Sequence, residues 1–341
     1  MSSQNKLTAK EIAFQLGISQ ATVSLAMNDK PGVNSETKRR ILEYIAKQEN
    51  KVQLFGGTIL HIMYVNREKY TIQEENTLFN YGYVEFLRMV QQERMELQLQ
   101  NVYSIEEMLE ALKASTDKAL GVVFCAADTP LEAMPLLDEC DVPLVVYSSD
   151  LMGDRWDAVC FHNEKAVKDG MALLEKNGHK DIVYLLNDFH SYNFRARRRA
   201  YQQYIFENAI DGRKPQFVPT GMNVDKAAQA IAEYLRGRNK LPDAIFSENY
   251  MTSIALSIAA QQLRIKIPQD MSIIGIDAIP EAIHMPYNMD HYSVPHAERM
   301  RIVGEMLFTK LKNNNLNIHA REVRISMKYQ KGDTIAKRNI K

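Results

Sequence analysis

The sequence lacks the features of a secreted or membrane protein. It contains only three cysteines, Cys125, Cys140 and Cys160, which are too few and too scattered for a disulfide framework or a metal cluster. No apolar run reaches the roughly 20 residues of a membrane span, and the polar start MSSQNKLTAKE has no apolar signal segment. We therefore expect a cytoplasmic protein with no membrane contact, three buried free thiols, and no metal or cofactor.

The chain also lacks an excess of charge, since 42 basic and 42 acidic residues give a formal net charge of zero. The distribution is uneven, because residues 1–52 carry eight lysines and arginines against five carboxylates, which leaves +3 there and −3 in the remainder. A small basic segment on a larger body is typical of a phosphate-contacting module, although a solvated helical face gives the same imbalance. The 341 residues allow two or three compact units.

Motifs of common enzyme classes are absent as well. No glycine-rich fingerprint follows the strand-like run TILHIMYV, and no P-loop, H-E-x-x-H or G-x-S-x-G motif occurs. The histidines His61, His162, His179 and His190 are scattered, as core or surface histidines are. These absences argue against an enzyme of the Rossmann type, and we expect no catalytic residue.

Three short helices are predicted in the first fifty residues. Thr8 and Glu11 fit a capping box, Gly17 ends the first helix, Ser19 caps the second and Asn34 caps the third. Their spacing predicts two helices crossing at a tight turn, a helix-turn-helix, and a plain three-helix bundle is the alternative. The apolar positions expected to pack inside are Ile12, Ala13, Leu16, Val23, Ala26, Ile41, Leu42 and Ile45.

Residues 19–28 form the predicted recognition helix. Short hydroxyls and amides near its N-terminus suit phosphate contact, because the helix dipole and the free N–H groups favour anions. Gln20 can make a bidentate contact to adenine, and Ala21 or Leu25 can meet a thymine methyl group. An ordinary polar helix surface is the alternative for each single residue.

The segment LTAKEIAFQLGISQATVSLAMN, followed by VNSETKRRILEYIA, resembles the head-piece of the lactose/galactose-repressor (LacI/GalR) family of bacterial transcription regulators. The resemblance implies base contacts from Gln20, Ala21 and Leu25. Leu25 departs from the arginine usual in the family, so we expect an apolar contact there. Phosphate contacts are implied for Ser19, Thr22, Ser24, Asn28 and Asn34, and we add Thr8 to the DNA-contacting set.

The short linker, residues 51–57, departs from the family pattern. Family members usually carry here a hinge helix with proline and alanine, whose leucine wedges the minor groove. Leu54 is the only leucine available, and Gly56 with Gly57 opposes helix continuation. We expect a flexible tether, with less bending of the central DNA.

From Thr58 onward, continuous β-branched runs alternate with helical patterns. Such runs indicate parallel sheets buried under helices on both faces, so we predict an α/β body of two doubly wound lobes. Strands are predicted over 58–65, 119–126, 143–148, 181–186, 244–247 and 271–277. Helices are predicted over 83–95, 164–176, 225–236, 252–263 and 296–312, with residues 66–80 as an expanded loop.

The body also resembles the family's effector domain, which is similar to periplasmic sugar-binding proteins; IPQDMSIIGIDAIP is the most specific segment. The resemblance implies a helix-turn-helix domain over residues 1–50 and an effector-binding domain over 58–341. The expected N-lobe covers about 58–162 and 294–322, and the C-lobe about 163–293 and 323–341.

Candidate effector-binding residues stand at the carboxyl ends of predicted strands, where open α/β sheets bind ligands. Asp277 and Asn249 directly follow strands, and Arg197 lies near the start of a helix. The three match the family's effector-binding residues, and their groups suit sugar hydroxyls. A solvated helix face for Arg197 and a loop cap for Asn249 are the alternatives.

Two departures bear on the ligand. Ser148 stands where many sugar-responsive members have aspartate, and Tyr250 replaces an aspartate after the asparagine. A lost carboxylate argues against an ordinary hexose, and the arginine-rich run leaves a phosphorylated sugar open. Ser148 and Tyr83 complete the expected effector set. Aromatic residues available for stacking are Phe79, Tyr81, Tyr83, Tyr192 and Phe194.

Together these features predict an allosteric, sequence-specific DNA-binding transcription regulator, most simply a repressor. We expect a homodimer that binds double-stranded operator DNA and senses a sugar or sugar derivative between its lobes. The alternative is an α/β small-molecule-binding protein or enzyme with no DNA-binding role. A transport-type sugar-binding protein would need an export signal and no helix-turn-helix.

Overall fold

A computed structural model of the chain describes residues 8–28, 30, 32–49, 56–65, 72–149, 156–188, 191–208, 213–221, 223–313 and 319–338. The chain divides into two compact units. The smaller, here the head, contains Met1–Gly56, and the larger, here the body, contains Gly57–Gln92 and Glu96–Lys341.

The head consists of three helices, as predicted: α1 (Ala9–Leu16), α2 (Gln20–Met27) and α3 (Ser35–Glu49). Gly17 ends α1 with a φ of 66°, in the left-handed region that favours glycine. The predicted caps at Ser19 and Asn34 are confirmed, since the Thr22 N–H donates to Ser19 Oγ at 3.1 Å and the Thr37 N–H to Asn34 Oδ1 at 2.7 Å. The predicted capping box of Thr8 and Glu11 stays a prediction.

A small apolar core holds these helices together. Its buried members are Ile12, Ala13, Val23, Ala26 and Ile41. Leu42, expected to share this core, is instead 46% exposed. Ile41 already occupies the inner side of α3, and the next residue on a helix is rotated away by about 100°. The side chains of Glu11 and Ile45 and residues 50–55 of the linker lie outside the described residues.

The body contains two six-stranded sheets, in the predicted α/β architecture. The first has the order β11-β5-β4-β3-β1-β2 and the second the order β12-β10-β9-β8-β6-β7. The strands of the first sheet are β1 (Gly57–Tyr64), β2 (Met95–Val102), β3 (Gly121–Cys125), β4 (Leu144–Tyr147), β5 (Asp157–Phe161) and β11 (Glu322–Ile325). Those of the second are β6 (Ile182–Leu186), β7 (Phe217–Pro219), β8 (Ala244–Ser247), β9 (Ser272–Ile276), β10 (His291–Ser293) and β12 (Lys328–Gln330).

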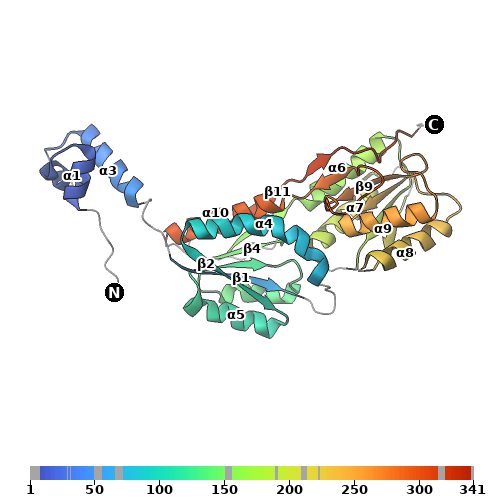
Figure 1. The fold of residues 1–341 in the computed structure, drawn as a ribbon, viewed down its shortest axis with the longest axis horizontal. Coiled ribbons are helices and arrows are strands. Elements are labelled where there is room, and N and C mark those ends of the chain that lie inside the picture. Colours follow the sequence, from blue (N-terminus) through green and yellow to red (C-terminus); the bar gives the residue numbers. More distant parts are fainter. Residues whose placement is uncertain are drawn as a thin grey trace. The chain divides into compact units, whose positions relative to one another are not determined.

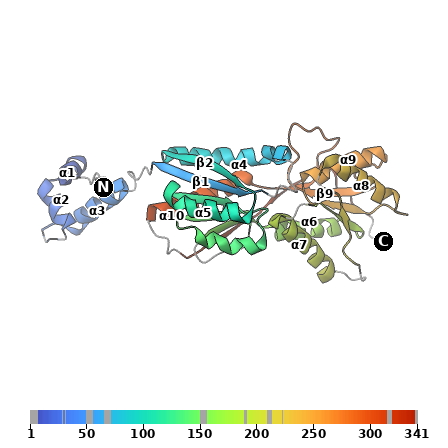
Figure 2. The same cartoon turned by 90° about the horizontal axis from the view of Figure 1, so that it is seen from below.

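Helices cover both faces of each sheet (Figures 1 and 2). In the first, α5 (Ile105–Lys118) and the 3-10 helix η1 (Leu131–Glu139) pack on one face, and α4 (Ile72–Gln92) and α10 (His296–Asn313) lie on the other. In the second, α6 (Asn163–Lys176) and α7 (Tyr192–Asn208) oppose α8 (Val224–Arg236) and α9 (Tyr250–Gln262). The expected loop over 66–80 is wrong from Ile72 onward, where α4 already runs.

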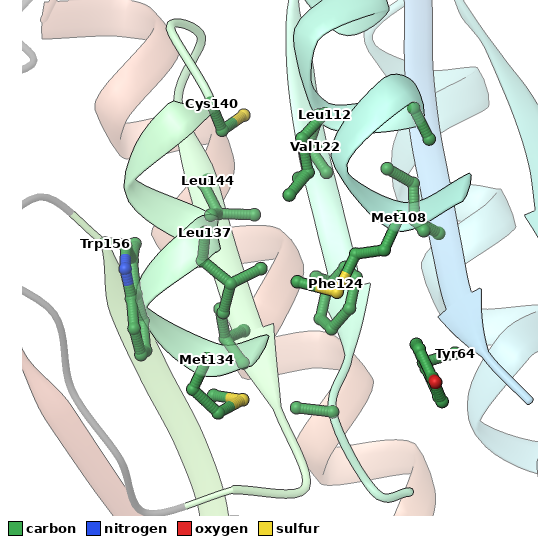
Figure 3. Packing of buried hydrophobic residues seen from close by; sticks show 14 of the residues in the cluster. Tyr64, Met108, Leu112, Val122, Phe124, Met134, Leu137, Cys140, Leu144 and Trp156 are labelled. Carbon is green, nitrogen blue, oxygen red and sulfur yellow. The ribbon is translucent and has the colours of Figure 1, made fainter. Parts of the chain in front are cut away.

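One apolar core of the first sheet lies on the face covered by α5 and η1. Met108 and Leu112 of α5 and Leu137 of η1 pack on Val122 and Phe124 of β3 (Figure 3). Because side chains alternate along a strand, the neighbouring positions of β1 and β4 face α4 and α10 instead. His61 and Tyr147 stand there, so this second face carries buried polar groups beside buried apolar residues such as Leu307. The three cysteines are free and buried, as expected.

Helices α4 and α10 approach each other closely at Gly82. A Cβ atom at this position would lie 2.7 Å from the carbonyl oxygen of His296 and 2.9 Å from Met300 Cγ. A backbone atom cannot rotate away as a side chain can, so the absence of a side chain at Gly82 is what allows the two helices to approach this closely here.

Replacing Gly82 by alanine should therefore lower the free energy of unfolding by about 1–3 kcal/mol, because overpacking forces the helices apart. Gly237→Ala is the matched control, since its nearest neighbour, Glu233 O, would lie 3.5 Å away. Urea unfolding of both variants measures the difference. A Gly82→Ala chain as stable as the parent would contradict the close approach.

Candidate functional site

The head exposes one side of α2. Val23 and Ala26 are buried, whereas Gln20, Ala21 and Ser24 are exposed. This outer side contains the predicted base-contacting positions, and Leu25 is half-buried. The other predicted DNA-contacting residues are all exposed or half-buried: Thr8, Ser19, Thr22, Asn28 and Asn34.

Capping fixes the ends of this helix. Ser19 Oγ accepts from the Thr22 N–H and lies 2.8 Å from Thr22 Oγ1, while Asn28 Nδ2 donates to the Ser24 carbonyl at 2.8 Å. These short polar side chains therefore stand in fixed orientations at both ends of α2. The helix N-terminus adds a positive field that favours a phosphate group.

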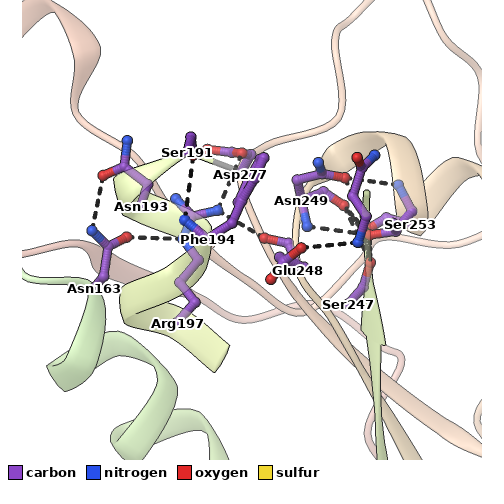
Figure 4. A network of polar contacts seen from close by, with 12 residues as sticks. Asn163, Ser191, Asn193, Phe194, Arg197, Ser247, Glu248, Asn249, Ser253 and Asp277 are labelled. Carbon is purple, nitrogen blue, oxygen red and sulfur yellow. Dashed lines mark hydrogen bonds and ion pairs between the residues drawn. The ribbon is translucent and has the colours of Figure 1, made fainter. Parts of the chain in front are cut away.

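In the body, Arg197 connects the ends of several elements. This side chain is only 3% exposed. Its Nε donates to Asn163 Oδ1 at 2.8 Å, its Nη1 donates to the Glu248 carbonyl at 2.7 Å, and Nη1 lies 3.9 Å from Asp277 Oδ2 (Figure 4). The solvated helix face considered for Arg197 is thus excluded, and the structure brings Arg197 and Asp277 together.

Asp277 follows β9 with a φ of 73°, a left-handed conformation that aspartate tolerates better than most residues. Burial raises the pKa of its carboxyl group, and the Arg197 guanidinium opposes that rise. Asn249 follows β8, and its Oδ1 accepts from the Thr252 N–H at 2.9 Å in a capping box. The cap considered for Asn249 is therefore present, and it places this residue directly after the carbonyl that binds Arg197.

The neighbouring arginine serves a different, structural purpose that the sequence did not reveal. Arg198 donates from Nε and Nη2 to both carboxylate oxygens of Glu248, each at 2.8 Å. Glu248 is fully buried, so burial raises its pKa while Arg198 lowers it. The Asn187 N–H also donates to this carboxylate at 2.9 Å. Arg198 thus balances the charge of Glu248, and Arg197 remains directed at Asp277.

A second polar cluster lies at the end of β4. Ser148 is 2% exposed, has a φ of 64° and accepts from Arg299 Nη1 at 3.0 Å. The Arg299 guanidinium lies over the rings of Tyr147 and Phe161, 4.6 and 5.0 Å from their centroids. Arg299 comes from α10, and it was not predicted because nothing in the sequence places it near Ser148.

Tyr83 belongs to the same cluster. It stacks on the ring of His61, with centroids 6.2 Å apart, and His61 Nε2 lies 3.0 Å from the Tyr147 hydroxyl. Burial, and secondarily Arg299, lowers the pKa of His61 to about 4. His61 is therefore neutral at physiological pH.

His296 lies between the two clusters. Its Nε2 is 4.0 Å from Asp277 Oδ1, and its ring meets the Phe161 ring edge-on at 5.6 Å. Burial, then Arg299 and Arg197, lowers its pKa to about 3. A backbone hydrogen bond also connects the start of α7 with the loop after β3, since the Tyr192 N–H donates to the Ala127 carbonyl at 3.1 Å.

The other aromatic candidates have different positions. Phe194 packs with Tyr250 and Met251, and the Arg197 guanidinium lies 5.5 Å from the centroid of its ring. Tyr192 is buried beside Cys160. The side chains of Phe79 and Tyr81 lie outside the described residues.

Among the described helices, none combines the length and apolarity that a membrane crossing requires.

Comparisons with known proteins agree with this architecture. The family model of a periplasmic binding protein-like domain matches residues 171–335. Catabolite control protein A of Priestia megaterium is 23% identical over 287 residues, 80% of this chain and 82% of the relative.

Two solved structures share the fold over almost the whole chain. One is the lac repressor dimer bound to operator and the anti-inducer ONPF, with a TM-score of 0.69 and 15% identity over 97% of this chain and 100% of that one. The other is the transcriptional regulator CelR in complex with cellobiose, with a TM-score of 0.67 and 17% identity over 96% and 99%.

Stability should depend on pH through His61. The unfolded chain takes up a proton near the ordinary pKa of 6.5, whereas the folded chain resists protonation down to about pH 4. The stabilisation is therefore complete above pH 6.5 and is lost as the pH falls toward 4, by about 3 kcal/mol at most.

The variant His61→Gln, which keeps a hydrogen-bonding group near Tyr147 but does not titrate in this range, should lose less stability between pH 6.5 and pH 4. His284→Gln, at an exposed histidine, should keep the parent's dependence. Denaturant unfolding at a series of pH values measures both. An unchanged slope in His61→Gln would refute the assignment.

Proposed function

We infer that this chain belongs to the LacI/GalR family of bacterial transcription regulators and is a sequence-specific DNA-binding regulator controlled by a small molecule. The observation that carries the inference is the outer side of α2, where Gln20, Ala21 and Ser24 are exposed while Val23 and Ala26 hold the helix to its core. The similarity to operator-binding and sugar-binding regulators over head and body supports it. A regulator needs no catalytic group, so we assign no enzymatic activity.

We propose that α2 reads operator DNA in the major groove. Gln20 would contact adenine, and Ala21 or Leu25 a thymine methyl group. Two chains in a homodimer would present two heads to half-sites one helical turn apart, or a multiple of it. The phosphate-contacting set is Thr8, Ser19, Thr22, Ser24, Asn28 and Asn34.

We propose that the effector, a sugar or sugar derivative, binds between the two lobes of the body. Arg197 and Asp277 would hold adjacent hydroxyls, with Asn249, Ser148 and Tyr83 around them. The N-lobe would consist of about residues 58–162 and 294–322, and the C-lobe of about residues 163–293 and 323–341. A coupling of about 1–3 kcal/mol between the sites would change operator affinity roughly 5- to 150-fold. The proposed compartment is the cytoplasm, where operator DNA is found.

Selection from a random-sequence DNA library should return a palindromic site whose affinity falls steeply with salt. Gln20→Ala should weaken binding to that site by about 5- to 150-fold and relax the preference at one base pair, because a bidentate contact is lost. Gln262→Ala, at an exposed glutamine of α9, is the control. Binding without sequence preference would refute the proposed function.

Asp277→Asn should weaken effector binding about 10- to 100-fold while operator affinity without effector stays unchanged, because an ionised acceptor is lost at an unchanged shape. Asparagine also tolerates the left-handed backbone of Asp277. The exposed Asp225→Asn serves as control. Operator release by effector, followed by fluorescence anisotropy, is the measurement; normal release by Asp277→Asn would place the effector elsewhere.

A further inference from the structure

His296 lies where the chain passes from the second sheet of the body to the first. It follows β10, which belongs to the second sheet, and it is the first residue of α10, which packs on the first sheet. Asp277 directly follows β9 of the second sheet. The two side chains therefore stand on different layers of the body, although they approach each other at the proposed effector site.

The imidazole ring of His296 has unmet hydrogen-bonding capacity. Both of its ring nitrogens are buried, and neither has a hydrogen-bond partner in the part of the chain that the structure describes. Burial lowers the pKa of His296 to about 3, so the ring is neutral and carries one N–H donor and one acceptor lone pair. Leaving a buried donor without a partner costs free energy, so a partner from outside the chain is favoured.

The carboxylate of Asp277 is in a similar state. Among the described residues, no N–H or O–H group donates a hydrogen bond to either of its oxygens. Arg197 Nη1 lies 3.9 Å from Oδ2, which is close enough for an ion pair but too far for a hydrogen bond (Figure 4). The carboxylate of Asp277 can therefore still accept a hydrogen bond from a ligand.

The gap between His296 and Asp277 has the width of one bridging atom. His296 Nε2 and Asp277 Oδ1 lie 4.0 Å apart, and one oxygen atom can stand about 2.8 Å from both. The carboxylate favours the tautomer with its hydrogen on Nε2, because this N–H dipole then points its positive end toward the negative charge. A bridging oxygen must therefore accept from Nε2 and donate to Oδ1.

This pair of requirements selects a class of ligand group. A hydroxyl group accepts and donates at the same oxygen atom. An ether or carbonyl oxygen cannot donate, and an ammonium group cannot accept. A water molecule has the same two functions as a hydroxyl, so it is the alternative occupant that an experiment must distinguish.

We propose that His296 is an effector-binding residue and that it shares one hydroxyl group of the effector with Asp277. Nε2 donates to the hydroxyl oxygen, and the hydroxyl donates to Oδ1. The effector is then a sugar or another polyol whose hydroxyl at this position is free, neither methylated nor part of a glycosidic bond. The shared hydroxyl would connect the start of α10 with the end of β9. The proposal rests on the proposed function, because it names a group of that same effector.

Analogues of one sugar test the shared hydroxyl. D-ribose, D-xylose, D-glucose, D-galactose and cellobiose are offered to the full chain, and binding is followed by the melting temperature and by calorimetry. For a sugar that binds, each hydroxyl is then replaced by hydrogen, by fluorine and by a methoxy group. At one position all three replacements should weaken binding about 10- to 100-fold, because none of them can donate. A panel without any binding sugar, or fluoro analogues that all bind like the parent, would overturn the proposal.

Variants of His296 then assign the contact. His296→Phe keeps a ring beside Phe161 but has no N–H group, so it should weaken the parent sugar about 10- to 100-fold and leave the deoxy analogue at the shared position nearly unchanged. His296→Gln can donate again and should restore part of the loss. His319→Phe, at an exposed histidine, is the control. Equal losses for parent and deoxy sugar in His296→Phe would mean that water or the fold uses His296, and would refute its contact with the effector.

A double-variant cycle adds a second measurement. Because both groups contact one hydroxyl, the combined loss in His296→Phe with Asp277→Asn should be clearly smaller than the product of the two separate losses. Losses that multiply would count against a shared hydroxyl. The analogue series uses the unaltered chain, and His296→Gln replaces His296→Phe in the cycle if the latter does not fold. Operator binding without sugar tests the proposed function independently, because none of these variants touches the head.

Discussion

The arrangement of the proposed effector site depends on the buried Arg197 guanidinium. It binds the first residue of α6 through Asn163, the carbonyl that follows β8, and the carboxylate that follows β9. Because a buried guanidinium must have its donors satisfied, these three chain ends are held in one place. Asp277 and Asn249 therefore have fixed positions without a ligand, which would lower the entropy lost if the proposed effector binds them.

The sequence predicted those parts of the fold that arise from local chemistry. Caps such as Ser19 and the glycine at position 17 act within a few residues, and the central strands are continuous apolar runs. The edge strand β2, with the sequence MELQLQNV, was not predicted, because polar residues alternate through it. The start of α4 was not predicted either, since its first turns, IQEENT, carry few apolar side chains.

The residues that surround the proposed effector site can be found from the sequence only in part, for a physical reason. Asn249 and Asp277 follow strands, so a rule about strand ends finds them, and Arg197 lies near the start of the helix that comes after β6. Arg299 lies 151 residues from Ser148 in sequence, and only the return of the chain into α10 brings them together. His296 and Glu248 are similar cases, because their importance comes from burial and from partners contributed by distant elements.

The close approach of the His296 carbonyl to Gly82 affects how α4 and α10 can move. Where two backbones touch without intervening side chains, no rotamer change can absorb a displacement. A ligand that moves the start of α10 toward Asp277 would therefore move α4 with it. A movement of α4 would in turn change the space available to the ligand. Such reciprocity is the thermodynamic requirement for allosteric coupling, and here it would be transmitted partly through a residue that has no side chain.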